Sequence, residues 1–301
     1  MNRSLLPACT LLFACSAALA ALPARAEQAI DQKVAADPHG AVEISNSVGS
    51  IHCTGWDRPE IQISGEMASS AARLDVQQQG ATTYIRVLTR NGGMTGTGET
   101  DLEIKMPAGS SLRVSAVSAD VEVRGITGDQ RLQSVSGDVQ TEAAKADVAL
   151  KSISGNVKVH GKAAPIHTSL STVSGDVSVL DVAGELELDT VSGDVTIDMA
   201  SLTRARLKTI SGDVLMTARL SPDVRIDGSS VSGNLRLRWP GAEGAAIEME
   251  SFSGDISSCF GGTPVQRPTY GPGSSWRHSP AGAKGDIHLK SMSGDINLCN
   301  R

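Results

Sequence analysis

Hydrophobic and polar residues alternate along most of the chain in short runs that glycine interrupts. Within this pattern a hexapeptide recurs: Ser or Thr, a bulky apolar residue, Ser, Gly, Asp or Asn, and an aliphatic residue. Eight copies occur, at residues 134–139, 152–157, 172–177, 190–195, 209–214, 230–235, 251–256 and 291–296, and a degenerate copy at 116–121 precedes them. Most copies lie 18 to 21 residues apart, and the last follows after 40. A repeat of this length predicts a solenoid.

Apolar residues spaced by two flank the glycine of each copy on both sides, a spacing that indicates strands and not helices. The column before the turn contains Leu132, Leu150, Leu170, Leu188, Leu207, Met249 and Leu289, with Gly228 as the exception. The column after it contains Val139, Val157, Val177, Val195, Val214, Leu235, Ile256 and Ile296. We therefore predict an all-β fold, a single-domain parallel β-solenoid with about 18–21 residues per coil and two short strands per coil.

The Ser-Gly-Asp segments are expected to form the corners of the coils. Glycine permits positive φ at a sharp corner, and Asp or Asn can accept backbone N–H groups as in Asx-turns. These structural turn residues are Gly137, Asp138, Gly155, Asn156, Gly175, Asp176, Gly193, Asp194, Gly212, Asp213, Gly233, Asn234, Gly254, Asp255, Gly294 and Asp295. A stack of carboxylates is also a calcium hypothesis. Because Asn156 and Asn234 replace Asp, we favour the turn and expect no metal and no cofactor.

Outside the regular repeats, four regions are expected. Residues 1–26 combine Arg3, an apolar run and Ala24-Arg25-Ala26, which predicts a cleaved signal peptide rather than a membrane anchor. Residues 27–115 alternate without the motif and are predicted to form N-terminal capping strands and first coils. Regular repeats at 116–257, an insertion loop at 258–285 and a last coil at 286–301 follow.

The insertion gathers Phe260, Tyr270, Trp276 and His278 in a chain that has few aromatic residues. Such a loop is a candidate binding loop, or a cap that covers the open end of the core; we favour the cap. Cys259 and Cys299 each lie six residues after the central Ser of their repeat. Stacked positions are about 4.8 Å apart, within disulfide range, so a Cys259–Cys299 disulfide that staples the last coil is predicted, with Cys53 free.

The formal net charge is −6, and residues 1–26 contain basic residues but no acidic ones. A mature chain of this sign lacks the basic patch that nucleic acid requires. No second long apolar run occurs, so no transmembrane segment is expected in the mature chain.

With its serial Val-Ser-Gly-Asp-Val motifs, its opening Val48-Gly49-Ser50-Ile51 and its terminal Ser-Gly-Asp-Ile-x-x-Cys, the chain resembles the bacterial putative-adhesin family. This family consists of β-strand-repeat domains of unknown function. The resemblance implies a β-solenoid at the cell envelope or surface, and it supplies no catalytic residue.

We therefore expect an exported, non-enzymatic scaffold, periplasmic, secreted or at the cell surface, that binds a protein or glycan partner of the envelope. One alternative is a periplasmic accessory protein of a stress response that binds a protein partner. The other is a polysaccharide-active β-helix enzyme, for which no outward column supplies converging acidic and basic residues.

Overall fold

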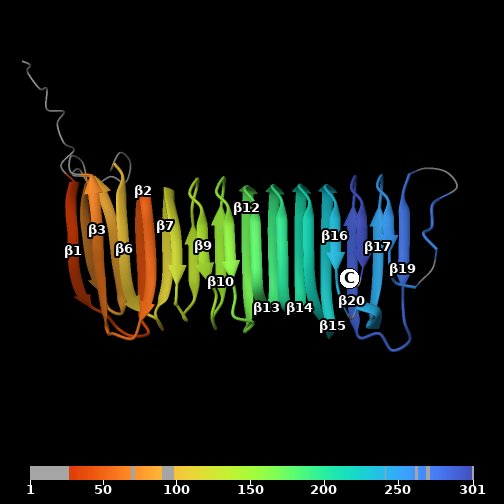
Figure 1. Cartoon of the computed structure of the whole chain (residues 1–301), viewed down its shortest axis with the longest axis horizontal. Helices are drawn as coiled ribbons and strands as arrows, with labels where there is room; N and C mark the ends of the chain where they lie inside the picture. Colours follow the sequence, from red (N-terminus) through yellow and green to blue (C-terminus); the bar gives the residue numbers. More distant parts are fainter. Residues whose placement is uncertain are drawn as a thin grey trace, which may run out of the picture.

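The structure is a computed structural model that describes residues 27–68, 72–89, 98–240, 242–261, 264–268 and 272–299. These residues form one 21-stranded sheet that winds about a long axis (Figure 1). The fold is all-β, as the alternation predicts, and the one helix in these ranges is the short 3-10 helix η1 (Ala242–Gly244). The same ranges contain no helix long and apolar enough to cross a membrane. The predicted signal peptide lies outside them.

Three groups of strands follow one another along the chain. The N-terminal group comprises β1 (Glu27–Ala35), β2 (Ala41–Trp56), β3 (Glu60–Ala68), β4 (Ala72–Gln79), β5 (Thr82–Thr89), β6 (Thr100–Pro107) and β7 (Ser111–Arg124). The central group comprises β8 (Gln130–Gln133), β9 (Val139–Glu142), β10 (Val148–Ser152), β11 (Val157–His160), β12 (Pro165–Ser174), β13 (Val177–Ser192), β14 (Val195–Ser211), β15 (Val214–Ser232) and β16 (Leu235–Arg238). The C-terminal group comprises β17 (Ala245–Ser251), β18 (Ile256–Ser258), β19 (Ser274–His278), β20 (Gly285–Ser291) and β21 (Ile296–Cys299).

Equivalent residues of successive repeats stack in register. Leu150 lies between Leu132 and Leu170, and Val157 lies between Val139 and Val177, in parallel pairs. Each coil thus presents one apolar column before its Ser-Gly-Asp corner and one after it. Both columns point inward and are almost fully buried, so their side chains form the continuous core that the sequence columns predict.

The expectation of two short strands in every coil, all of them parallel, needs correction. β8 to β11, β16, β18 and β21 are short, with three to five residues each. In contrast, β13, β14 and β15 run for 16 to 19 residues through the wide bend that joins one coil to the next. The sheet is also mixed, because antiparallel pairs flank the repeats: β1–β3, β3–β6 and β4–β5 at one end, and β17–β19 at the other.

The order of coils in space differs from their order in the chain at both ends. At the N-terminal end, β2 lies between β7 on one side and β5 and β6 on the other. At the C-terminal end, β20 lies between β15 and β17, and β21 lies between β16 and β18. The last coil in the chain is therefore not the last coil in space. It is inserted between two earlier coils and pairs on both sides.

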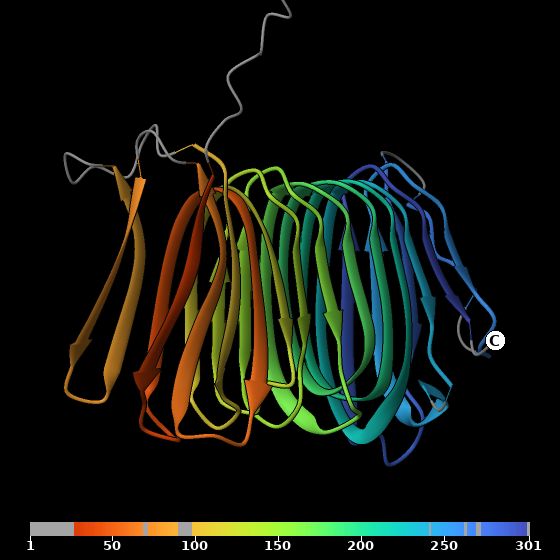
Figure 2. The ribbon, with the colours of Figure 1, turned by 60° about the vertical axis from the view of Figure 1, so that its left-hand side comes forward.

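Antiparallel strands cover the outermost parallel strands. β19 pairs with β17 at one end; at the other, β3 and then β1 lie outside β6 on one side of the coils, and β4 lies outside β5 on the other, where the β4–β5 hairpin projects (Figure 2). An uncovered edge presents free N–H and C=O groups that invite pairing with another chain. The reversed strands therefore cover the parallel strands β5, β6 and β17 where the repeat stops, whereas β18 pairs with β21 alone in the described residues.

One polar pair interrupts the aliphatic core. Gln130 occupies an inward position and is fully buried; it donates a hydrogen bond from Nε2 to the Glu142 carbonyl oxygen (3.0 Å). Thr141, equally buried on the opposite strand, donates from Oγ1 to the Gln130 side-chain oxygen. Gln130 and Thr141 thus satisfy each other, as most buried polar groups are satisfied. Thr168, which stands in the same inward column as Gln130, is also buried, and its hydroxyl has no hydrogen-bond partner in the described residues.

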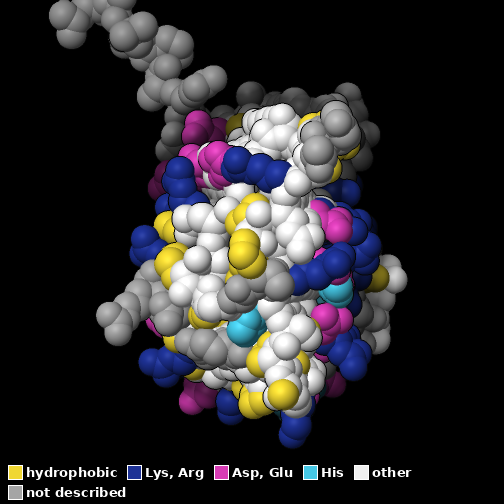
Figure 3. Space-filling model, turned by 90° about the vertical axis from the view of Figure 1, so that its right-hand side faces the viewer, with side chains coloured by type: hydrophobic (Ala, Val, Ile, Leu, Met, Phe, Trp, Pro, Cys, Tyr) yellow, Lys and Arg dark blue, Asp and Glu magenta, His cyan; other side chains and the backbone are white. Residues whose placement is uncertain are grey.

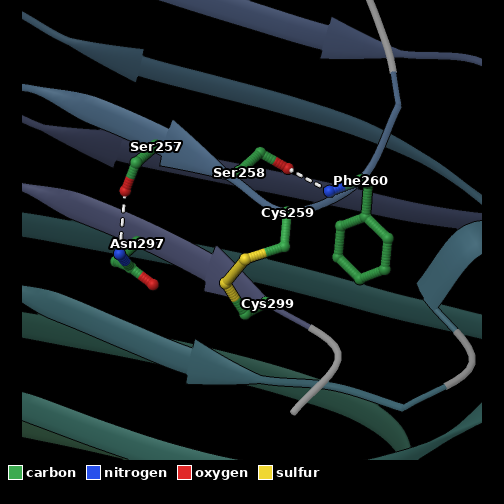
Figure 4. Close-up of a disulfide and its surroundings, with 6 residues drawn as sticks. All are labelled: Ser257, Ser258, Cys259, Phe260, Asn297 and Cys299. Carbon is green, nitrogen blue, oxygen red and sulfur yellow. Dashed lines mark hydrogen bonds between the residues drawn. A yellow bond between two sulfur atoms is a disulfide. The ribbon is translucent and has the colours of Figure 1, made fainter.

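The predicted disulfide is confirmed. Cys259 and Cys299 are bonded, with their Cα atoms 4.9 Å apart (Figure 4). Beside it, Asn297 Nδ2 donates to Ser257 Oγ (2.8 Å) across the same pair of coils. The last coil is held by neighbours on both sides, so the disulfide fastens the outermost coil, which contains Cys259, to the inserted last coil, which contains Cys299. Cys53 is free and buried between Ile104 and Val123.

We predict that the double variant Cys259→Ser/Cys299→Ser lowers the free energy of unfolding by about 4 kcal/mol, because the bond closes a 40-residue loop in the unfolded chain. The measurement is denaturant unfolding with and without reductant. Reductant should leave the double variant unchanged. An equal midpoint for the oxidised parent and the variant would contradict the prediction.

A second prediction concerns pH. Burial raises the pKa of the Cys53 thiol from 9.0 to about 12. Above pH 9 the thiol ionises in the unfolded chain but stays protonated in the folded one. The protonated Cys53 thiol contributes its full stabilisation below pH 9. Between pH 9 and about 12 this contribution is lost, and the free energy of unfolding should fall by up to about 1.4 kcal/mol per pH unit.

The control for this prediction is Cys53→Val, which keeps an apolar side chain and removes the titration. Both proteins begin at Glu27, so that Cys9 and Cys15 are absent. Subtracting the two pH profiles isolates the thiol. Profiles that remain parallel up to pH 11 would show that Cys53 ionises equally in both states.

Candidate binding surface

The hexapeptides form one long edge of the molecule, along which β12 to β15 end (upper edge of Figure 1). The first residue of each hexapeptide is buried beneath this edge. The hydroxyl oxygens of Ser134, Ser152 and Ser251 accept the N–H of the glycine three residues later, at 2.9–3.0 Å. In these three copies the bond closes the corner from inside. In the other five it is not made: Ser230 Oγ donates to the Gly233 carbonyl oxygen (3.1 Å), and the buried hydroxyls of Thr172, Thr190, Thr209 and Ser291 have no hydrogen-bond partner in the described part of the chain.

The glycines are required chiefly by the neighbouring coil. A Cβ atom added at any of the eight corner glycines would lie 2.0–2.4 Å from a carbonyl oxygen of the adjacent coil. Positive φ was expected at all of them, and this holds only for Gly193 (φ 125°) and Gly212 (φ 131°). At the other six, the close approach of two backbones excludes a side chain.

The Asp and Asn residues connect coils to one another. Asp138 accepts the backbone N–H of Asn156 on its Oδ1 (2.8 Å), and Asn156 in turn accepts that of Asp176 (3.0 Å). The same bond, at 2.8–3.3 Å, joins Asp120 to Asp138, Asp176 to Asp194, Asp194 to Asp213, Asp213 to Asn234, Asn234 to Asp295, and Asp295 to Asp255. We call these nine residues the Asx line. An Asx-turn within one coil was expected; the bond instead crosses to the next coil.

An arginine of the insertion ends the Asx line. Asp255 belongs to the outermost coil, so no further coil supplies an N–H for its carboxylate. Arg267 occupies that place and donates to Asp255 Oδ1 (2.7 Å). The insertion therefore closes the hydrogen-bonded series at its C-terminal end.

A row of exposed apolar side chains runs beside the Asx line. It consists of the second residue of each hexapeptide, which alternation turns away from the core. In spatial order the row is Val117, Val135, Ile153, Val173, Val191, Ile210, Val231, Met292 and Phe252, each between 39% and 59% exposed. We call it the apolar ladder. Nine residues at a spacing of about 4.8 Å extend for roughly 38 Å.

The apolar ladder is a surface that a partner can use. Burying an aliphatic side chain fully contributes about 1.5–3 kcal/mol, so covering the exposed half of each residue contributes roughly 1 kcal/mol. Serine occupies the next position in every copy, which shows that the edge accepts polar side chains. The corner itself does not require apolar side chains at the rung positions. A continuous exposed apolar row of this kind is typical of an interaction site.

The aromatic residues of the insertion are divided between core and surface. Phe260 and Trp276 are buried at the C-terminal end of the core, and His278 stacks on Trp276 with ring centroids 6.0 Å apart. Tyr270 lies outside the described residues. Seen from this end, charged side chains lie mainly around the rim, and uncharged ones occupy the middle (Figure 3). The two buried rings thus cover the core, the role of a cap.

A cleft of about 560 Å³ opens where the apolar ladder meets the insertion. Phe252, the most C-terminal rung in space, lines it together with Gln266, Arg267, Pro268 and Lys290. Arg267 is held by Asp255, and Lys290 by Glu250 (3.2 Å). The cleft extends the apolar ladder and does not form a separate enclosed site.

The titratable groups form cross-strand ion pairs. The Arg277 side chain hydrogen-bonds Glu248 across β19 and β17 and holds the pKa of that carboxyl below its usual range, with His288 adding to the effect. Within the described ranges no group of three His, Cys, Asp or Glu side chains could hold a metal ion.

Residues 41–299 match one family model over most of the chain. The chain belongs to the Toastrack DUF4097 family. No curated protein matches the sequence.

Two solved structures resemble the Toastrack chain in fold. One, from Parabacteroides distasonis ATCC 8503, is described as a "putative adhesin"; it is 10% identical, with a TM-score of 0.54, covering 90% of this chain and 97% of the other. The second, a "putative adhesin" from Parabacteroides merdae ATCC 43184, is 11% identical, with a TM-score of 0.53 and coverage of 90% and 96%. At such identities the likeness establishes the fold alone, which extends over nearly the whole of those chains.

We predict that Asp176→Ala lowers the free energy of unfolding of the Toastrack chain by about 1 kcal/mol, because the Asp194 N–H loses its acceptor. Asp176→Asn should keep the stability of the parent, since Asn156 and Asn234 already accept the same bond. Chemical denaturation of the three proteins side by side is the measurement. Equal losses in both variants would mean that the carboxylate charge, and not the hydrogen bond, matters.

Proposed function

We propose that this protein is an exported, non-enzymatic binding scaffold of the cell envelope, and that its partner contacts the apolar ladder. The apolar ladder is the observation that carries the proposal. It is continuous over nine coils and exposed throughout, and the coils that present it are locked in register by the core and the Asx line. A rigid, linear surface of this kind suits a partner that is itself extended.

The regular part is proposed to be a parallel β-solenoid with two strand segments in each coil, one on either side of the Ser-Gly-Asp corner. In the long strands β13 to β15 the second segment of one coil continues into the first segment of the next. The Ser-Gly-Asp residues then serve the stacking of coils. This leaves the apolar ladder, and not the turn motif, as the element that faces a partner.

Export has two supports. The Cys259–Cys299 disulfide is typical of proteins in an oxidising compartment. The sequence of residues 1–26 has the n-region, apolar run and small-x-small site of a signal peptide. The description of the structural neighbours as adhesins is consistent with a scaffold that binds at the cell envelope. Adhesion and the binding of a periplasmic partner would use the same surface.

The proposal predicts site-specific crosslinking. The photoreactive residue p-benzoylphenylalanine is placed at Val191 on the apolar ladder and, as a control, at Ser178 on an outward position of β13, away from the ladder. Illumination of cells that produce each variant should give a discrete, higher-mass product from Val191 and none from Ser178. Fractionation of the same cells locates the product.

The contrary outcomes are clear. Equal products at both positions would indicate unspecific collision, and an absence of product at Val191, Ile153 and Val231 alike would remove the apolar ladder as a binding surface. If the purified protein turned over a polysaccharide, the proposal of a non-enzymatic scaffold would be wrong and the protein would be an enzyme.

A further inference from the structure

We propose that the apolar ladder binds a cationic amphipathic α-helix of a partner protein, with the apolar stripe of the helix on the ladder and its basic residues against the Asx line. This inference rests on the proposed function and specifies the chemistry of the partner. Three features carry it: the charge beside the apolar ladder, the uncharged strip between the two, and the spacing of the rungs.

The charge beside the apolar ladder is acidic and mostly unpaired. Seven of the nine residues of the Asx line are aspartates. Asp213 has Arg236 as its partner (3.6 Å) and Asp255 has Arg267 (2.7 Å). The remaining five, Asp120, Asp138, Asp176, Asp194 and Asp295, have no basic side chain within 4.0 Å in the described part of the chain. Each uses Oδ1 for the neighbouring coil, which leaves Oδ2 to meet a cation from outside. At Asp138, Oδ2 also accepts a long hydrogen bond from Asn156 Nδ2 (3.5 Å).

The strip between the two rows carries no charge. Each rung of the apolar ladder is followed by a serine, then the corner glycine (Ala119 in the first copy), then the residue of the Asx line. Across the edge the order is therefore apolar, hydroxyl, acidic in seven of the nine copies, with Asn156 and Asn234 in the acidic place of the other two. On the other side of the apolar ladder the outward column is mixed, with Lys151, Asp189, Lys208 and Glu250 among its members. The edge thus has one consistently acidic flank, which a basic face complements.

The spacing of the rungs favours a helix over an extended strand. Rungs recur about every 4.8 Å along the axis. A helix that lies along the apolar ladder presents an apolar residue about every 5.4 Å, once per turn. A strand presents one about every 6.8 Å on the same face. Over three turns the mismatch between the helix residues and the rungs adds up to roughly 2 Å, which a Leu side chain can bridge. For a strand, a mismatch of about 2 Å arises between each outward residue and the next.

The experiment uses three 18-residue synthetic peptides with blocked ends. The first places Leu at helical spacing with Lys elsewhere, the second replaces Lys by Glu, and the third scrambles the Leu and Lys of the first. Binding to the protein beginning at Glu27 is measured by fluorescence anisotropy at low and at high salt. We expect the Leu/Lys helix to bind at least tenfold more tightly than either of the other two, and to weaken with salt.

Two double variants locate the binding. Val191→Ser/Ile210→Ser should weaken it at least tenfold by removing two rungs, and Asp176→Asn/Asp194→Asn about fivefold by removing two charges. The matched control is Asp198→Asn/Asp223→Asn, which removes the same charge from exposed positions away from the Asx line and should bind like the parent. Thermal unfolding of each variant shows that it is folded.

Several outcomes would overturn the inference. They are equal binding of the Leu/Glu peptide, equal losses in the control variant, and no loss in the rung variant. Sedimentation that shows a dimer dissolved by Val191→Ser/Ile210→Ser would assign the apolar ladder to a second copy of this chain. If crosslinks form at Val191 while no peptide binds, the helix is wrong and the scaffold function stands. If neither occurs, both fail.

Discussion

The close approach of successive backbones at the Ser-Gly-Asp corner is the constraint on which the rest of the structure depends. A Cβ atom has no room there, because the carbonyl of the next coil lies 2.0–2.4 Å from where it would be. Glycine at this position lets the coils stack tightly, and tight stacking brings the Oδ1 atom of each Asp or Asn within hydrogen-bond distance of the next coil. The corner, the Asx line and the regular spacing of the apolar ladder therefore have one origin.

Much of the architecture could be predicted from the sequence because inward positions repeat. The Leu and Val columns predict the core, and the equal offset of Cys259 and Cys299 from their repeats predicts the disulfide. The exposure of the apolar ladder was also encoded. Leu132 and Ser134 point inward, so Val135, the residue after Ser134, points outward. An apolar residue in a repeated motif is nevertheless easily assigned to the core. What the sequence does not show directly is that stacking in register joins these residues into one continuous row.

The order of the coils could not be predicted from the same columns. Any coil stacks acceptably on any other, because each presents the same apolar residues in the same register. One residue did carry the information. Gly228 interrupts the Leu column, and a Cβ there would lie 2.7 Å from Leu289 Cδ2. Since Leu289 belongs to the last coil, Gly228 is matched to the coil that is inserted beside it and not to the next one in sequence.

Insertion at both ends changes what the chain termini do. Terminal segments usually fray because they pair on one side only. Here β20 and β21, the last described strands, pair on both sides, and the outermost coil at that end is the earlier one of β17 and β18. At the other end β2 also pairs on both sides, whereas β1, the first described strand, pairs with β3 alone within the described residues. The same insertion extends the binding edge. Met292 enters the apolar ladder between Val231 and Phe252, so the rungs grow from Val to Met to Phe toward the cleft. A partner aligned by the uniform rungs would thus meet its largest apolar contacts at one end, and this fixes the direction in which it lies.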